Sequence, residues 1–84
     1  MTLQFTGRAW EDYLHWQSQD RTILRRVNLL IRDTLRAPFE GIGQPEPLRF
    51  ALSGCWSRRI DGEHRLVYRV AGETLVILQA RYHY

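Results

Sequence analysis

The sequence of 84 residues has no lysine, a single cysteine and no long apolar run. One cysteine, Cys55, cannot form an internal disulfide, and no C-x-x-C pair or Cys/His array has the spacing of a metal site. No segment approaches the roughly 20 apolar residues of a membrane span. Residues Met1 to Phe5 lack the basic start and apolar core of a signal peptide. The sequence therefore predicts a cytoplasmic protein with no metal, no cofactor and no membrane association.

The residues that are present suit one small domain covering residues 1–84. Hydrophobic residues make up 44% of the chain, with three Trp, four Tyr and three Phe, which excludes wholesale disorder. The net charge of +3 comes from twelve basic residues, all of them Arg, against nine acids. Arginine binds phosphate bidentately and stacks on bases, which favours a nucleic-acid partner. A bias toward Arg also follows from genomic base composition, so charge alone does not establish RNA binding.

The first half of the chain reads as a short strand followed by two helices. Leu3-Gln4-Phe5 alternates like a strand, and Thr6 is a candidate N-cap for a helix through about Gln17. Within that helix, one face is expected to carry Trp10, Tyr13, Leu14 and Gln17. Asp20 is expected to cap a second helix that runs to about Arg36. The apolar face of the second helix is predicted to contain Ile23, Leu24, Val27, Leu30, Ile31 and Leu35.

The second helix also carries an arginine stripe on the face opposite its apolar residues. At about 100° per residue, its four members fall within an arc of roughly 60°; they are Arg21, Arg25, Arg32 and Arg36. This stripe is either an ordinary solvated face or a surface that faces RNA.

The second half changes to a period of two residues after a loop from Ala37 to Pro47. Strands are expected over Leu48–Ser53, Trp56–Ile60, His64–Val70 and Thr74 to about Arg81, with a hairpin turn at Asp61-Gly62. The predicted fold class is α+β, in the order β-α-α-β-β-β with a further β. Two N-terminal helices pack on one face of an antiparallel sheet, and the other face is left free for a ligand.

Alternation places a group of basic side chains on that free face. Its expected members are Arg49, Arg59, Arg65 and Arg69, joined from the last strand by Arg81 and His83. Glu46 lies between two prolines that restrict the backbone on both sides and give its carboxylate a preset direction. The aromatic ending of the chain indicates that the tail Arg81-Tyr82-His83-Tyr84 is held in place rather than frayed.

A carboxylate, an imidazole and a guanidinium can together carry out RNA transesterification. A base takes the proton of the ribose 2′-OH, the alkoxide attacks phosphorus, and an acid protonates the departing 5′-oxygen. Histidine suits the acid role because its ordinary pKa of about 6.5 lies near working pH, and fixed guanidinium groups offset the charge of the phosphorane. From spacing alone, a loop carboxylate at Glu46, a cross-strand ion pair at Arg65 and a solvated His83 explain the same residues. His64 is assigned to packing and Cys55 to an inert thiol.

Several short strings occur in the order and at the spacing of one known family. The helical half contributes Trp10-Glu11-Asp12-Tyr13-Leu14 with Trp16, the loop contributes Pro38-Phe39-Glu40-Gly41, Gly43 and Pro45-Glu46-Pro47-Leu48, and the second half contributes Leu52-Ser53-Gly54, Trp56-Ser57-Arg58-Arg59-Ile60, Glu63-His64-Arg65-Leu66-Val67-Tyr68 and Arg81-Tyr82-His83-Tyr84. Over essentially its whole length, the chain resembles the YoeB/Txe toxins of the RelE superfamily. These are ribosome-dependent messenger-RNA interferases encoded beside an antitoxin.

The resemblance implies a RelE-like compact fold and a role for each site residue. It makes Glu46 the general base, Arg65 the phosphate-stabilising residue and His83 the general acid, with Tyr84 completing the site. The implied RNA-binding residues are Arg49, Arg59 and Arg81, although relatives commonly carry Lys where this chain has Arg49.

The resemblance also implies an activity and a set of partners. It predicts metal-independent cleavage of A-site codons, a homodimer, a YefM/Axe-like antitoxin, and operator DNA bound only through the antitoxin complex. The alternative is a non-catalytic RNA-, DNA- or antitoxin-binding module, which would use the same arginines without requiring Glu46 and His83.

Overall fold

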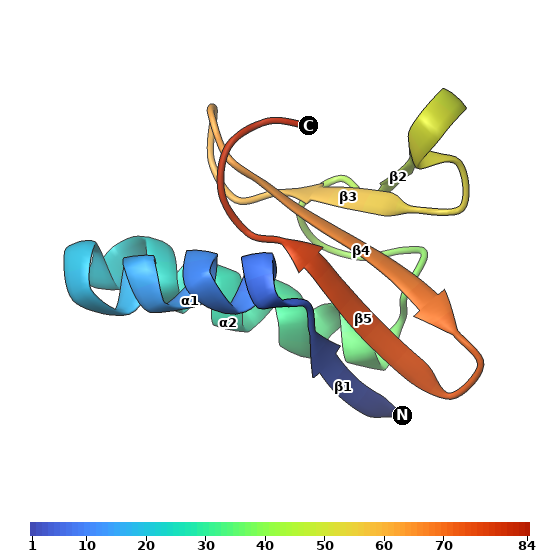
Figure 1. Ribbon diagram of the computed structural model, residues 1–84, viewed down its shortest axis with the longest axis horizontal. Helices are drawn as coiled ribbons and strands as arrows, with labels where there is room; N and C mark the ends of the chain where they lie inside the picture. The colour runs from blue at the N-terminus through green and yellow to red at the C-terminus, as the bar shows by residue number, and fades with distance from the viewer.

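Two capping residues define the helices in the computed structural model, which describes residues 1–84 (Figure 1). Helix α1 covers Gly7–Gln19, and the Thr6 side chain accepts a hydrogen bond from the backbone N–H of Ala9. Helix α2 covers Arg21–Arg36, and Asp20 accepts from the N–H groups of Thr22 and Ile23. Each such cap stabilises a helix by about 1 kcal/mol. Asp20 also ends α1, so the two helices are joined as a tight hairpin, and both predicted caps are confirmed.

Five strands form one sheet in the order β1-β5-β4-β3-β2. Their bounds are β1 Thr2–Phe5, β2 Glu46–Pro47, β3 Trp56–Arg59, β4 Arg65–Ala71 and β5 Thr74–Gln79. The predicted antiparallel meander is present from β2 to β5. Strand β1, however, pairs parallel to β5, so the whole sheet is mixed. The α+β class is confirmed. Strand β1 lies at the edge of the sheet, and both helices and three strands separate it from β5 along the chain.

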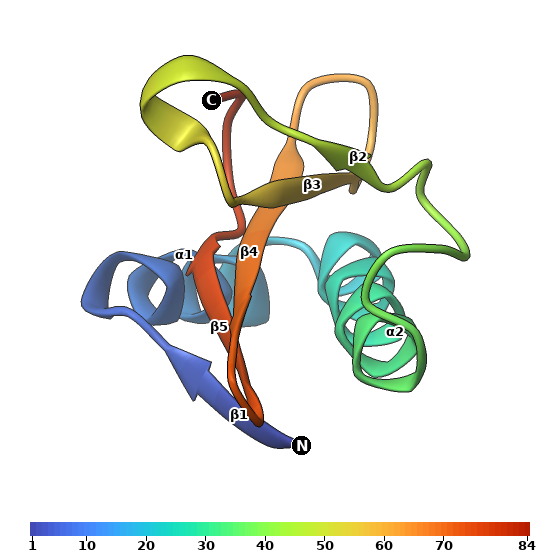
Figure 2. The same cartoon turned by 90° about the vertical axis from the view of Figure 1, so that its right-hand side faces the viewer.

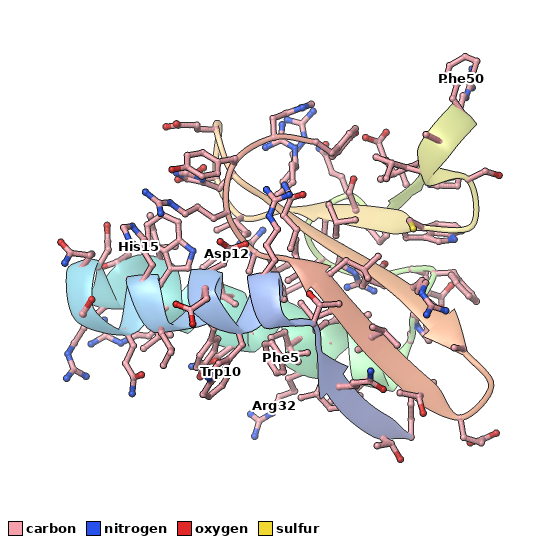
Figure 3. The ribbon with its side chains drawn as sticks, in the orientation of Figure 1. Phe5, Trp10, Asp12, His15, Arg32 and Phe50 are labelled. Atoms are coloured by element: carbon pink, nitrogen blue, oxygen red, sulfur yellow. The ribbon has the colours of Figure 1, made fainter.

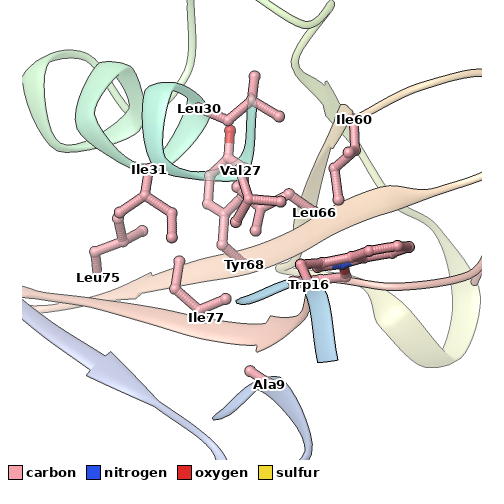
Figure 4. Packing of buried hydrophobic residues seen from close by; sticks show 11 residues of the cluster. Ala9, Trp16, Val27, Leu30, Ile31, Ile60, Leu66, Tyr68, Leu75 and Ile77 are labelled. Atoms are coloured by element: carbon pink, nitrogen blue, oxygen red, sulfur yellow. The ribbon is translucent and has the colours of Figure 1, made fainter. Parts of the chain in front are cut away.

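The core lies between the helical hairpin and one face of the sheet (Figure 4). Alternate residues of β4 and β5, such as Tyr68 and Ile77, face it from the sheet. The predicted apolar face of α2 is confirmed, because Val27, Leu30 and Ile31 are buried there. Burying a side chain of this size stabilises the fold by about 1.5–3 kcal/mol. Neither helix has the length and apolar content needed to cross a membrane.

The predicted face of α1 is wrong. Its buried residues are Ala9, Asp12 and Trp16, whereas Trp10 is 47% exposed. Trp10 stacks on Tyr13 at the edge of the molecule, with ring centroids 5.7 Å apart. The hydrophobic spacing failed here because Asp12 is a polar residue that faces the interior to accept a backbone hydrogen bond.

The predicted strand over Leu48–Ser53 is also wrong. Strand β2 has two residues only, and Phe50–Leu52 form a short 3-10 helix, η1. Pro47 has no N–H to donate to a neighbouring strand, which weakens pairing at this edge. Phe50 then adopts a positive φ of 56°, which turns the chain away from the sheet.

Candidate active site on the open face of the sheet

One cross-strand row places the predicted base on the face away from the helices. Glu46 lies opposite Ser57, Ser57 opposite Val67, and Val67 opposite Gln79. Directly opposed residues point to the same face of a sheet. Glu46 and Gln79 therefore share the open face although they lie on the first and last strands of the meander. Arg59 and Arg65 form the next row on that face.

A β-bulge is what brings Gln79 to this face. Tyr68 pairs with Ile77 while Val67 pairs with Gln79, so Leu78 is the extra residue of β5. A bulge re-aims the side chains that follow it. Simple alternation from Ile77 would have placed Gln79 in the core, and the bulge instead directs its amide toward the chain end.

The Gln79 amide holds the tail by three main-chain oxygens. Its Nε2 lies 2.9 Å from the carbonyl oxygen of Arg81 and 3.3 Å from those of Tyr82 and His83. Gln79 is only 7% exposed, so this donor is shielded from water. Tyr82 has a positive φ of 67°, which tightens the turn. The chain end consequently curls back over β3 (Figure 1).

Four further hydrogen bonds anchor the start of the tail. Asp12 accepts from the Ala80 N–H at 3.0 Å, and the Trp16 indole N–H donates to the Ala80 carbonyl at 2.7 Å. His64 Nδ1 accepts from the Tyr82 N–H at 2.7 Å, and the Tyr82 carbonyl accepts from the Arg65 N–H at 3.0 Å. The tail is thus held in place, as predicted, and His64 has the structural role expected of it.

The last two residues meet Glu46 in space. The Tyr84 hydroxyl donates to Glu46 Oε1 at 3.1 Å, across 38 residues of sequence. His83 Nδ1 lies 3.1 Å from the main-chain oxygen of Tyr84, and the two rings have centroids 4.5 Å apart. Glu46, His83 and Tyr84 are all exposed, so a substrate can reach them.

Arg65 is held rigidly with part of its guanidinium free. The residue is only 8% exposed, and its Nη1 donates to the carbonyls of Asp61 at 2.8 Å and His64 at 3.0 Å. Nε and Nη2 make no hydrogen bond within the protein, and neither atom is fully buried. These remaining N–H groups can donate to a phosphate without any further ordering of the side chain.

The loop that leads from α2 to Glu46 is organised around a fully buried arginine. All five N–H groups of Arg58 are used, on the Tyr68 hydroxyl, a carboxylate oxygen of Asp33 and the carbonyls of Ala37, Glu40 and Ile42. The Ile42 N–H, Arg36 and Arg58 together lower the pKa of Asp33 to about 2. Burial raises the pKa of the Tyr68 hydroxyl.

An open cleft of about 670 Å³ lies between η1 and the tail. Its walls are formed by residues 46–52 and by Tyr84. Figure 2 shows the C-terminus beside this segment. Glu46 and Tyr84 therefore lie in one open depression whose volume can hold part of a nucleotide chain.

The structure brings only some of the predicted RNA-binding arginines to this site. Arg59 is exposed on the open face beside Arg65. Arg49 is exposed but precedes η1 rather than lying on a strand, because the predicted strand there is absent. Arg69 lies two residues after Val67 on β4, opposite Val76, and therefore points to the open face. Arg81 is half-buried over the Tyr82 ring at 4.5 Å and the Trp16 ring at 6.0 Å, so its guanidinium packs against the protein.

The arginine stripe of α2 is exposed, as the periodicity predicts. Arg21, Arg25, Arg32 and Arg36 are all accessible, although Arg36 pairs with Asp33 at 2.9 Å. Arg25 and Arg32 flank a second hollow with Asn28 and Leu29. Nowhere in residues 1–84 do three His, Cys, Asp or Glu side chains come together as metal ligands.

Sequence reasoning missed three positioning residues of this site: Gln79, Asp12 and Arg58. The signal for Arg58 was available, because it lies two residues from both Trp56 and Ile60 and therefore shares the core face with them. Gln79 gave no such signal, since the bulge at Leu78 is a feature of the folded sheet.

Comparisons with known proteins identify the family and the fold of this chain. The family described as the YoeB-like toxin of bacterial type II toxin-antitoxin systems matches residues 5–84. A Streptomyces coelicolor protein named Toxin YoeB is 57% identical over 84 residues, covering all of both chains. The solved YoeB/ParE toxin from Agrobacterium tumefaciens is 48% identical, with full coverage of both chains and a TM-score of 0.98.

Two Staphylococcus aureus structures are also similar, each covering all of this chain and 98% of the other. One is a YoeB dimer, with 40% identity and a TM-score of 0.92. The other is a heterotetrameric YoeB-YefM toxin-antitoxin complex, with 40% identity and a TM-score of 0.91.

Proposed function

This chain belongs to the YoeB-like toxins of type II toxin–antitoxin systems, and from that membership we propose that it cuts messenger RNA at the codon in the ribosomal A site. Toxins of this family and of the wider RelE group are endoribonucleases. For this chain we propose in addition that the ribosome is the site of action and that the chemistry is a metal-free transesterification.

Glu46, Arg65 and His83 supply the chemical steps. Glu46 takes the proton of a ribose 2′-OH, and the 2′-oxygen forms a bond to the neighbouring phosphorus. The bond from phosphorus to the 5′-oxygen breaks as His83 donates a proton to that oxygen. The products are a 2′,3′-cyclic phosphate upstream, which water can open to a 3′-phosphate, and a 5′-hydroxyl downstream. General acid and base each contribute about 10²–10⁴-fold in rate.

The contacts of each side chain suit its step. Nδ1 of His83 faces the Tyr84 main-chain oxygen, so a protonated ring can donate there and keep its Nε2 proton for the leaving oxygen. The free N–H groups of Arg65 can donate to a phosphorane whose negative charge is increasing. Tyr84 orients the Glu46 carboxylate until a ribose hydroxyl replaces the phenol.

The observation that carries the proposal is the hydrogen bond between Tyr84 and Glu46. It joins the candidate base to the segment that bears the candidate acid, at 3.1 Å. A packing or purely RNA-binding role gives no reason for a chain end to be held by Gln79, His64 and Ala80 contacts in that register.

We expect two protein partners. A YefM/Axe-like antitoxin and a second copy of this chain are supported by the S. aureus complex and dimer to which the chain is similar. Operator DNA would be bound only through the antitoxin complex. The ribosome places the site of action in the cytoplasm.

The arginine stripe of α2 is the surface we assign to ribosomal RNA. Replacing Arg21, Arg25, Arg32 and Arg36 with Gln should weaken ribosome binding and flatten its dependence on salt, because fewer counterions are released. An unchanged salt slope would instead leave the stripe as a solvated face.

Incubation with translating ribosomes, followed by mapping of messenger-RNA ends, tests the proposal. Cleavage should occur within A-site codons and should be absent from the same RNA without ribosomes. Glu46→Ala and His83→Ala should each cut about 10²–10⁴-fold more slowly while remaining folded by circular dichroism. If both folded variants cut at the wild-type rate, the assignment of Glu46 as base and His83 as acid would be wrong. If the wild-type protein bound ribosomes without cutting the message, the alternative of a non-catalytic binding module would replace this function.

A further inference from the structure

Phe50 combines two features that a stable domain normally avoids. Its side chain is 93% exposed, more than any other large apolar residue of the chain. Its backbone has φ of 56°, a left-handed conformation that is unusual for a bulky residue. Glycine would fit this backbone without strain, and a polar residue would tolerate the exposure. Strained positions of this kind concentrate at ligand-binding sites.

The ring stands at the outer rim of the cleft that contains Glu46 and Tyr84. Phe50 belongs to η1 and is one of the residues that line this cleft. Figure 3 shows the ring at the tip of the molecule, extending outward from η1. A polymer whose reacting group lies at Glu46 has Phe50 within the same cleft, at the rim where a neighbouring unit of the polymer can lie.

The neighbours of Phe50 favour an RNA strand as the polymer. Arg49 precedes it directly, is exposed and also lines the cleft, so the rim carries both a cation and an aromatic ring. Proteins that bind single-stranded nucleic acid combine these two groups, the cation for the backbone and the ring for the base. Leu48 and Leu52 line the same cleft and make part of its wall apolar.

We propose that Phe50 is a stacking platform for one unpaired nucleobase next to the scissile phosphate. The inference rests on the proposed function, because it assumes that RNA reacts at Glu46. Every base has a π-face, so the platform accepts any base and strengthens binding without reading a codon. Base–aromatic stacking of this kind corresponds to roughly 5- to 150-fold in affinity.

A binding experiment tests the platform independently of cleavage. Proteins with Phe50 and with Phe50→Leu are compared in a Glu46→Ala background. Each is bound to ribosomes whose messenger RNA carries 2-aminopurine at one position beside the cleavage site, and each flanking position is tested in turn. Stacking quenches 2-aminopurine fluorescence, so one position should be quenched with Phe50 and should brighten with Leu, which retains apolar bulk but has no π-face. Phe50→Trp should restore quenching.

Cleavage kinetics provide the second readout, with Glu46 intact. Phe50→Leu should raise KM for the ribosome-bound message by roughly 5- to 150-fold and change kcat little, because stacking binds substrate and transition state alike. Phe50→Trp should restore KM. A fall in kcat alone, or quenching that is equal in the Phe50 and Leu proteins, would overturn the proposal.

The two hypotheses fail in different ways. If the protein does not cut ribosome-bound RNA, the proposed function fails, whereas the fluorescence assay still reports on stacking. If Phe50→Leu retains quenching and cleavage but loses antitoxin affinity, the ring is an antitoxin contact and the platform is refuted.

Discussion

Gln79→Met removes the donor that holds the chain end while keeping the length and volume of the side chain. The Gln79 amide has two hydrogens, shared among the carbonyl oxygens of Arg81, Tyr82 and His83 at 2.9, 3.3 and 3.3 Å. Methionine cannot donate to any of them. The bonds that anchor Ala80 and Tyr82 are untouched, so the change acts on the last residues of the tail.

The expected magnitude follows from those two hydrogens. A net contribution of about 0.5–1.5 kcal/mol for each hydrogen bond gives about 1–3 kcal/mol for the pair. The ratio of docked to undocked tail should then fall by roughly 5- to 150-fold. His83 leaves its position when the tail undocks, and misplacement by about 1 Å costs on the order of 100-fold in rate. We therefore expect kcat to fall with little change in KM.

Two assays separate tail docking from general damage to the fold. Carboxypeptidase should remove Tyr84 faster from Gln79→Met than from the wild type, while the urea midpoint of the whole domain changes little. Gln17→Met is the matched control, because Gln17 is an exposed glutamine of α1. If Gln79→Met cleaved RNA at the wild-type rate and its tail were still protected from carboxypeptidase, the positioning role of Gln79 would be refuted.

Three other predictions concern the Glu46 loop and the tail. Arg58→Lys should lower the free energy of unfolding in urea by about 3–5 kcal/mol, because lysine has at most three donors for five buried acceptors; a loss below about 1 kcal/mol would contradict this. The pKa of Asp33 is lowered from 3.8 to about 2, chiefly by the Ile42 N–H. Its contribution to stability is therefore present above its unfolded pKa of 3.8 and is lost as pH falls toward 2, and Asp33→Asn should flatten acid unfolding across that interval. Deleting His83 and Tyr84 should abolish cleavage and toxicity while keeping much of the antitoxin affinity, measured by calorimetry; a toxic truncated chain would refute the assignment of the acid.

The features that could be predicted from the sequence are those set by near neighbours along the chain. Thr6 and Asp20 act within three residues of themselves, so their caps were visible before any tertiary contact was known. The prolines beside Glu46 and the aromatic chain end likewise indicated preset positions. Their closure into one site depended on register between distant strands, which only the folded sheet supplies.

The errors have the opposite origin. Leu48, Phe50 and Leu52 alternate like a strand, yet pairing stops after Leu48, whose N–H donates to the Cys55 carbonyl, and the chain forms η1 instead. Gln79 points to the site because of a bulge at Leu78, and that bulge exists only where β4 meets β5. In both places tertiary pairing overrode the local pattern.

The chemical nature of the RNA ends tests the central claim most directly. Messenger RNA cut on ribosomes by the wild-type protein is recovered, and its downstream fragment is offered to a kinase without prior phosphatase treatment. Proton transfer by Glu46 and His83 around a 2′-OH attack predicts direct labelling of a 5′-hydroxyl, with a 2′,3′-cyclic or 3′-phosphate on the upstream fragment. A downstream 5′-phosphate paired with an upstream 3′-hydroxyl would show that water attacked phosphorus, and it would contradict the mechanism.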